Sequence, residues 1–155
     1  MMYRNQEGYA DPTAGQAMSR VMREYREQRK SLWRQEHDAR NRKKVYVVSR
    51  YAGNIDVNVA NAIRYCRFVI DQSCMPVASH LLYPQMLDDN DPDQRLLGTM
   101  FGLVLLALCR EVWVFGTELS PGMRREVREA KRLGKRLRYF DEQCQEVIPW
   151  DSPKN

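Results

Sequence analysis

Short apolar runs alternate with segments of helical spacing from Val45 onward. Four runs are brief and rich in β-branched or aromatic residues, which predicts strands: VYVVS, MPVAS, EVWVFG and KRLRYF. An order of strand, helix, strand, helix, strand, helix, strand is typical of a parallel sheet with helices on both faces. The pattern therefore predicts an α/β, Rossmann-like (flavodoxin-like) sheet of four to five strands, preceded by an N-terminal helix.

Three helices are expected between these strands. In residues 57–72, one helical face carries Val59, Ile63, Cys66 and Ile70. Residues 94–109 are apolar nearly all round, which predicts burial on more than one side, and Asp91 or Asp93 can cap that helix. The third helix begins near Pro121 and ends at Gly134, with Met123, Val127 and Ala130 on its inward face.

The N-terminal segment has a different texture. Residues 13–41 hold helix formers with a weak apolar stripe, which predicts a long helix that docks on its own domain or on a second subunit. The stripe consists of Met18, Val21, Met22, Tyr25, Leu32 and Trp33. We expect three regions: a basic helical segment at 1–44, an α/β domain at 45–142 and a polar tail at 143–155.

The formal net charge of +5 is unevenly distributed. Residues 1–44 hold 11 Lys/Arg and 6 Asp/Glu, whereas residues 45–155 hold 14 of each. Two interpretations of the basic segment remain open: a solvated helix, or a surface that touches nucleic acid or an acidic partner.

Several classes of protein fit the composition poorly. The four cysteines form no CxxC pair and only two histidines are present, so we expect neither a metal site nor a cofactor. Cys66 and Cys109 lie in apolar helical stretches and are expected to be buried thiols of a reducing, cytoplasmic protein. The N-terminus is polar, and the longest apolar run, MFGLVLLALC, is about half a membrane span.

The strand order selects a candidate ligand site. Ligands of open parallel sheets bind beyond the carboxyl ends of the strands. The residues singled out there are Ser49, Arg50, Tyr51 and Gly53 after the first strand, Ser79 and His80 after the second, and Gly116, Ser120, Pro121, Gly122, Met123 and Glu126 after the third.

The turn SPGMRRE carries the most chemistry. Ser120 is a good N-cap, Pro121 suits the first helical position, and Gly122 leaves room near free N–H groups that favour anions. Glu126 comes one turn too late for a capping box and lies about 100° round the helix from Val127. Either a carboxylate faces a sugar beside a phosphate-binding turn, or a capped helix carries a surface glutamate.

The other candidates also have two interpretations. Arg50, Tyr51 and Gly53 suit a phosphate or base contact, but they also suit an ordinary strand–helix loop. His80 can contact a substrate or make a structural hydrogen bond.

The order of these pieces resembles the nucleoside 2-deoxyribosyltransferase-like superfamily, and more closely a poorly characterised bacterial and phage branch of it. The resemblance rests on VYVVSRYAGN, CRFVIDQSCMPVASHLLYPQMLDD, LGTMFGLVLLALCREVWVFG and SPGMRREVREAKRLGKRLRYF, which cover roughly residues 45–140. It implies a nucleotide or nucleoside ligand and chemistry at an N-glycosidic bond, by transfer to another base or by hydrolysis.

The resemblance also implies roles for individual residues. Glu126 would be the nucleophile that attacks the anomeric carbon, Ser120 and Gly122 would hold a 5'-phosphate, and Arg50 and Tyr51 would line the sugar and base.

Two departures from that superfamily stand out. The superfamily carries an aspartate in the helix before the third strand, where this chain has the region of Leu103 and no carboxylate between Asp93 and Glu111. A proton donor for the leaving base would have to come from Asp88, Asp89 or His80. Arg124 and Arg125 also add positive charge to the turn, which can favour a phosphorylated ligand and can depress the pKa of Glu126.

Three hypotheses follow from the sequence. The first is an enzyme of the N-glycosidic bond, and the second is a non-catalytic protein that binds or senses a nucleotide. The third is an interaction module that uses the basic helix, for instance on nucleic acid. A homo-oligomer with interfaces on the long helix and on the apolar helix at 94–109 is expected, and no membrane association.

Overall fold

The computed structural model describes residue 4, residues 7–9 and residues 12–149. The chain divides into two compact units between Asn41 and Arg42. The first contains α1 (Pro12–Asn41), a helix of 30 residues in which no residue is buried. The second contains the sheet and the remaining helices.

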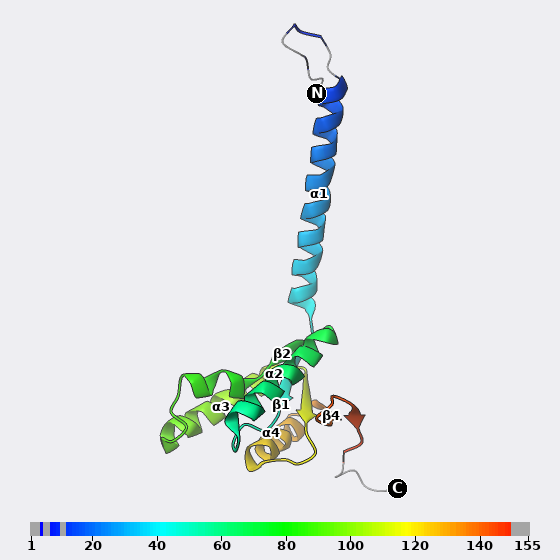
Figure 1. Ribbon diagram of the computed structural model, residues 1–155. Coiled ribbons are helices and arrows are strands. Elements are labelled where there is room, and N and C mark those ends of the chain that lie inside the picture. The colour runs from blue at the N-terminus through cyan, green and yellow to red at the C-terminus, as the bar shows by residue number, and fades with distance from the viewer. Residues whose placement is uncertain (1–3, 5–6, 10–11, 150–155) are drawn as a thin grey trace. The chain divides into compact units, whose positions relative to one another are not determined.

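The sheet has five strands in the order β2-β1-β3-β4-β5 (Figure 1). They are β1 (Lys44–Val48), β2 (Met75–Val77), β3 (Glu111–Phe115), β4 (Arg136–Phe140) and β5 (Glu146–Val147). The first four are parallel, and β5 runs antiparallel to β4. The predicted Rossmann-like α/β fold is therefore confirmed, and the segment expected to be a polar tail contributes its short edge strand.

The strand order reverses beside β1. Val45 of β1 is paired with Pro76 of β2 on one side and with Glu111 of β3 on the other. The chain thus moves outward from β1 to β2 and then returns past β1 to reach β3. This reversal opens a crevice between the carboxyl ends of β1 and β3, which is where such sheets bind ligands.

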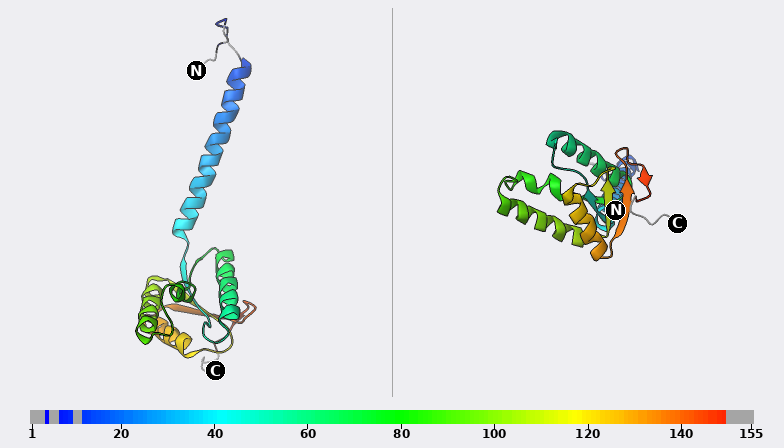
Figure 2. Two further views of the ribbon diagram at one scale, coloured as in Figure 1. Left: turned by 60° about the vertical axis from the view of Figure 1, so that its left-hand side comes forward. Right: turned by 90° about the horizontal axis from the view of Figure 1, so that it is seen from below.

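Helices cover both faces of the sheet. Figure 2 shows α2 (Ile55–Asp71) on one side, and α3 (Pro92–Leu108) together with α4 (Pro121–Arg132) on the other. Successive strand side chains point to opposite faces, so β1 supplies Tyr46 and Val48 to the α3–α4 core and Val45 and Val47 to the α2 core. The segment between β2 and α3 contains two short 3₁₀ helices, η1 (Ser79–Leu81) and η2 (Tyr83–Gln85).

The buried face of α2 differs from the apolar face seen in the sequence. The buried residues are Ala62, Tyr65 and Val69, whereas Ile63 and Ile70 are exposed. Tyr65 stacks on Phe115 of β3 with ring centroids 4.5 Å apart. An aromatic stack therefore decides how α2 is rotated against the sheet, and hydrophobic residues alone do not indicate that rotation.

The prediction that α3 is buried on more than one side is wrong for the single chain. Only Gly102 and Leu106 of α3 are buried. A contiguous apolar strip remains exposed, comprising Leu96, Leu97, Met100, Phe101, Val104 and Leu108. The helix does begin as predicted, since the Asp91 side chain accepts hydrogen bonds from the N–H groups of Asp93 and Gln94.

The cysteines are partly as expected. Cys109 is buried but Cys66 is only half-buried, and burial raises the pKa of each thiol to about 11. Within the described residues, no helix is long and apolar enough to cross a membrane. The same part of the chain contains no group of three or more side chains that could hold a metal ion.

Candidate functional site

Two cavities lie at the carboxyl ends of the strands. We name the first the Glu126 cavity; it has a volume of about 260 Å³ and lies on the α3–α4 side of the sheet. Its lining comes from the β1–α2 loop, η1 and η2, the loop before α3, α3 itself and the start of α4. We name the second the Arg50 cavity; it has about 210 Å³ and lies beside α2.

A hydrogen-bonded chain of three side chains forms the floor of the Glu126 cavity. The Tyr46 hydroxyl donates to Glu126 Oε1 at 2.7 Å and lies 2.6 Å from Ser79 Oγ. Tyr46 is completely buried and Ser79 nearly so. Because Tyr46 approaches Oε1, the second carboxylate oxygen of Glu126 has no bond to this chain of side chains.

Burial controls the ionisation of this group. It raises the pKa of Glu126 to about 7, against the opposing effect of the Tyr46 hydrogen bond. Burial, together with the adjacent Glu126 charge, raises the pKa of the Tyr46 phenol, so that Tyr46 stays a hydrogen-bond donor. The expectation that Arg124 and Arg125 depress the pKa of Glu126 is wrong, because both arginines are exposed and the cavity excludes them.

Close packing by α3 makes this burial possible. A Cβ added to Gly102 would lie 2.9 Å from Ser79 Oγ and 3.2 Å from the Tyr46 hydroxyl. Glycine is therefore required for α3 to approach the hydroxyl pair. Because α3 lies against the hydroxyl groups of Tyr46 and Ser79, water is excluded from that side of Tyr46. The Glu126 carboxylate remains at the cavity.

The start of α4 forms one wall. The Ser120 side chain caps the helix by accepting a hydrogen bond from the Met123 N–H at 3.3 Å, and Pro121 follows it, as predicted. Because Oγ acts as the acceptor there, the Ser120 hydroxyl proton is available to an outside acceptor. A Cβ on Gly122 would meet only Ser120 Oγ, at 3.9 Å, so the space in front of this turn is open.

His80 lies on another wall of the cavity. Its Nε2 is 2.8 Å from Ser49 Oγ, which joins η1 to the end of β1. Burial lowers the pKa of His80 to about 4, so the imidazole is neutral at neutral pH. A neutral imidazole positions hydrogen bonds but carries no charge to the site.

The α3 wall contains no acid. The residues that α3 contributes to the cavity are Gln94, Arg95, Gly98, Thr99 and Gly102. Asp89, in the loop before α3, is a carboxylate that lines the cavity. Asp89 Oδ1 lies 3.8 Å from Arg95 Nε. Asp88 does not line the cavity.

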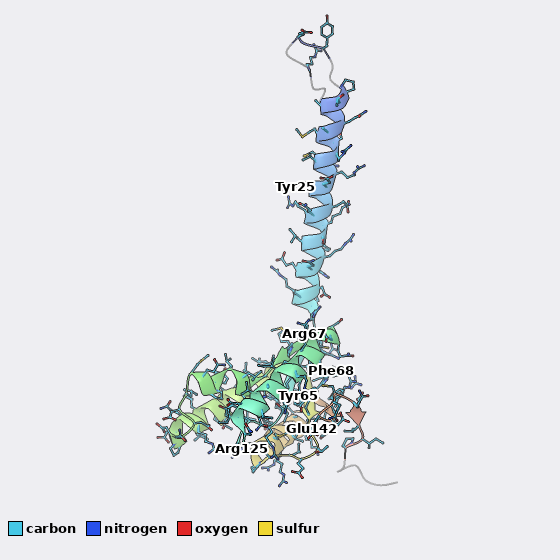
Figure 3. All side chains as sticks on the ribbon, in the orientation of Figure 1. Tyr25, Tyr65, Arg67, Phe68, Arg125 and Glu142 are labelled. Atoms are coloured by element: carbon cyan, nitrogen blue, oxygen red, sulfur yellow. The ribbon has the colours of Figure 1, made fainter. Side chains whose placement is uncertain are left out.

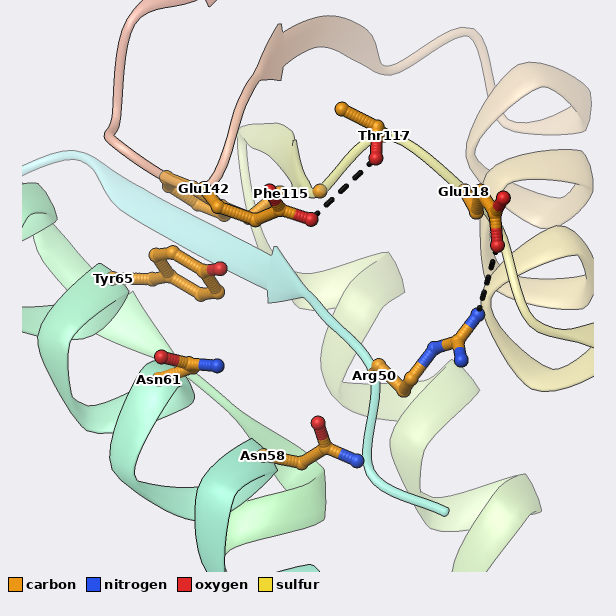
Figure 4. Close-up of a pocket in the computed structure, with 9 residues that line it drawn as sticks. Arg50, Asn58, Asn61, Tyr65, Phe115, Thr117, Glu118 and Glu142 are labelled. Atoms are coloured by element: carbon orange, nitrogen blue, oxygen red, sulfur yellow. Dashed lines mark hydrogen bonds and ion pairs between the residues drawn. The ribbon is translucent and has the colours of Figure 1, made fainter. Parts of the chain in front are cut away.

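The Arg50 cavity is the more polar of the two (Figure 4). Arg50 Nη2 lies 3.7 Å from Glu118 Oε2, and Thr117 donates to Glu142 at 3.5 Å. Asn58, Asn61 and Tyr65 line the α2 side, and Figure 4 shows them on the wall opposite Glu118. The charges here pair with one another at the surface.

The structure separates the candidate residues into groups. The Glu126 cavity brings together Ser49, Tyr51, His80, Ser120, Pro121, Gly122, Met123 and Glu126. Arg50 and Gly116 line the Arg50 cavity instead. Gly53 lines neither; its φ of +104° serves the turn into α2.

Sequence reasoning missed Tyr46 and Gly102. A tyrosine within the aliphatic run VYVV needs a partner for its hydroxyl, which was the available signal for Tyr46. Glycines four residues apart in an apolar helix, Gly98 and Gly102, were the signal for a close approach by α3.

Solved structures with similar folds include two 2-deoxyribosyltransferases. That of the psychrotolerant bacterium Bacillus psychrosaccharolyticus gives a TM-score of 0.55 at 14% identity, over 68% of this chain and 77% of that chain. The 2-desoxiribosyltransferase of Leishmania mexicana gives 0.49 at 14% identity, over 64% of each chain. A CMP N-glycosidase of Clostridium botulinum gives 0.40 at 17% identity, over 64% of this chain and 69% of that chain.

The likeness to the Bacillus enzyme shows a shared nucleoside 2-deoxyribosyltransferase-like fold. No match was found among curated proteins. A family model matches residues 43–140, which span the four parallel strands and the helices between them. The chain therefore belongs to the family described as Domain of unknown function (DUF7768).

Proposed function

We propose that the Glu126 cavity binds a nucleoside or nucleotide and that the protein cleaves or transfers its N-glycosidic bond. The observation that carries the proposal is the half-buried Glu126, whose carboxylate is bonded to Tyr46 at 2.7 Å and lines a cavity that also contains the start of α4. The shared fold with a 2-deoxyribosyltransferase supports the class of substrate.

The chemistry follows from the carboxylate. Ionised Glu126 attacks the anomeric carbon through the oxygen that Tyr46 does not hold, forming a glycosyl ester. The carbon–nitrogen bond breaks, and its electron pair leaves with the base, which takes up a proton. Water or a second base then attacks the same carbon and releases Glu126. With a pKa of about 7, roughly half of the protein carries the reactive form at neutral pH.

The start of α4 fits the other end of a nucleotide. The Ser120 hydroxyl and the Gly122 N–H lie where a helix N-terminus favours an anion. Gly122 has open space before it, so a phosphate can approach the backbone. A 5'-phosphate held here would place the sugar one helical turn away, beside Glu126.

The leaving base needs a proton, and no α3 side chain that lines the cavity is an acid, so the proton must come from a residue outside α3. Besides Glu126, Asp89 is the acid that lines the cavity; it lies in the loop before α3, with its Oδ1 3.8 Å from Arg95 Nε. We propose Asp89 as the donor. His80 is already deprotonated near neutral pH and suits a positioning role.

A second candidate function is nucleotide binding without catalysis. The absence of an acidic side chain among the α3 residues at the cavity favours it. In that case Glu126 would recognise a sugar hydroxyl, and no base would be released.

We also propose a homo-oligomer in which a second copy covers α3. Leu96, Met100, Val104 and Leu108 recur at four-residue spacing on α3, and Leu108 is 70% exposed. An exposed strip of this kind is typical of an interface. The proposal fails if light scattering at micromolar concentration gives a monomer.

The test is a screen of nucleosides, 2'-deoxynucleoside monophosphates and NAD for released base, read by chromatography. Glu126→Gln keeps the size of the side chain but removes the nucleophile, and Glu129→Gln, one turn along α4, is the matched control. We expect base release that falls by a factor of about a thousand or more in Glu126→Gln alone. A thermal shift with one nucleotide and no released base would replace catalysis by binding. If the screen gives neither released base nor a thermal shift, the proposal is overturned.

A further inference from the structure

The helix α1 carries an apolar seam along one side of its exposed surface. Most of its large apolar residues follow a seven-residue repeat, with Met22 and Trp33 outside the seam. One heptad position holds Met18, Tyr25, Leu32 and Ala39, and the position three residues later holds Val21, Gln28 and Gln35. These are the a and d positions of a coiled coil, sustained over about three heptads.

The seam is fully available. No residue of α1 is buried; Val21 is 56% exposed and Leu32 is 65% exposed. Figure 3 shows Tyr25 projecting outward from the helix. A helix gains most of its stability in proteins by packing an apolar face, so this face needs a partner.

The charges beside the seam match a second copy of the same helix. In this register Glu24 occupies position g and Arg29 the following position e. In a parallel pair, g of one helix faces the next e of its partner, which sets Glu24 against Arg29 twice, once on each side. An antiparallel pair would set g against g and e against e, and would therefore not bring Glu24 opposite Arg29.

Most of the cations of α1 stay in water when the seam is covered, whereas Glu36 and Asp38 flank the seam at positions e and g. The outward positions b, c and f hold Arg20, Arg23, Arg26, Lys30, Arg34 and Arg40, with Glu27 among them. Lys30 bonds to Glu27 within the helix at 3.0 Å, on this outer face. Pairing along the seam therefore desolvates none of these cations.

We propose that α1 forms a parallel, in-register coiled coil with α1 of a second copy of this chain. Met18, Val21, Tyr25 and Leu32 form its apolar layers, and Gln28 and Gln35 form polar layers that fix the register at a cost in stability. The surface is distinct from the exposed strip of α3 and does not depend on the proposed chemistry of Glu126.

Cysteine cross-linking of the full-length protein tests the geometry. In the parallel register the two copies of Val21 face each other, so Val21→Cys should form a disulfide between chains under mild oxidation. Arg23→Cys lies on the outer face and is the matched control, and the parent protein accounts for the native thiols. Peptide mapping assigns the bridge. We expect at least a fivefold higher cross-linked fraction for Val21→Cys.

Charge reversal tests the pairing and its orientation. On the Val21→Cys background, Glu24→Arg alone and Arg29→Glu alone each make both pairs repulsive, and cross-linking should fall by roughly tenfold at low salt. Mixing the two variants makes both pairs attractive again, so cross-linking should return between unlike chains.

The outcomes are decisive even if α3 also holds two chains together, because only α1 carries the reporter. Equal cross-linking at positions 21 and 23 would overturn the proposed register. The parallel pairing would be overturned if charge reversal left the cross-linked fraction unchanged, or if mixing the two variants did not restore it. Absence of any interchain bridge at position 21 would overturn the coiled coil itself.

Discussion

The two cavities at the carboxyl edge of the sheet contain similar functional groups but hold them differently. Each includes a tyrosine, a carboxylate and an arginine. In the Glu126 cavity the carboxylate belongs to a half-buried side chain and is bonded to a buried phenol. In the Arg50 cavity, Arg50 and Glu118 meet at 3.7 Å, with side chains 49% and 85% exposed.

The difference teaches that burial, and not the number of charged groups, decides whether the ionisation of a carboxylate is shifted. Burial raises the pKa of Glu126 to about 7, so its carboxyl group changes ionisation near neutral pH. The pair in the Arg50 cavity is screened by solvent and stabilises little. Variants of one cavity, each matched to a variant of the other, can break or sharpen this contrast.

After the loss of Glu126 itself, the largest expected effect on base release is that of Tyr46→Phe. In the proposed mechanism Glu126 reacts when ionised, so the rate should rise with pH through about 7. Loss of the phenol hydrogen bond, which lowers the pKa of Glu126, should move that limb to higher pH and reduce the rate by roughly tenfold to a hundredfold. The measurement is a pH–rate profile. Tyr65→Phe in the Arg50 cavity is the control, and an equal effect there would remove the contrast.

A second effect concerns stability. The folded pKa of Glu126 lies above its ordinary value of 4.5, so the protonated form is favoured by folding. That contribution is present below pH 4.5 and is lost as pH rises through about 7. Glu126→Gln abolishes the loss, and its free energy of unfolding should exceed that of the wild type by about 1–2 kcal/mol at pH 8 but not at pH 4.

Denaturant unfolding across this pH range makes the measurement. Glu118→Gln in the Arg50 cavity should follow the wild type at every pH, because its carboxylate is exposed. If Glu126→Gln and the wild type keep the same difference from pH 4 to pH 8, the Glu126 carboxylate is not held in a dry site.

The sequence predicted the sheet better than it predicted the site. The run VYVV is apolar at successive positions because both faces of β1 are covered, and that pattern leads directly to a central parallel strand. Likewise the inward face of α4, with Met123, Val127 and Ala130, emerges as predicted from its spacing. A local sequence pattern is enough to predict which face of a helix or strand is buried when that face packs against a whole layer of the fold.

Contacts between single side chains from distant elements escaped prediction. Tyr46 and Glu126 are 80 residues apart, and nothing in either local sequence indicates that they share a hydrogen bond. Arg50 was grouped with the Glu126 site because both follow strands, but the side chain of Arg50 points to the α2 side of the crevice. Strand order fixes which edge a residue occupies and leaves open which face of the sheet its side chain reaches.

The third prediction concerns how α3 closes the Glu126 cavity. Gly102→Ala places a methyl group 2.9 Å from Ser79 Oγ, so the hydroxyl pair must shift. We expect a loss of about 1 kcal/mol in the free energy of unfolding, in spite of the higher helix propensity of alanine. Gly98→Ala is the matched control. Its methyl group meets the flexible Leu87 side chain at 3.3 Å, and it should be neutral or slightly stabilising.

The smallest effect is the coupling between Arg50 and Glu118. A double-mutant cycle with Arg50→Gln and Glu118→Gln should give a coupling free energy below about 0.5 kcal/mol, because both side chains are solvated. The same cycle on Tyr46→Phe and Glu126→Gln should give about 1–3 kcal/mol, since at pH 8 the hydrogen bond of Tyr46 serves a charged carboxylate in the wild type but a neutral amide in the Glu126→Gln variant. Unfolding at pH 8 measures both. Equal coupling in the two cavities would mean that burial does not separate them, and the assignment of reactivity to Glu126 would lose its physical basis.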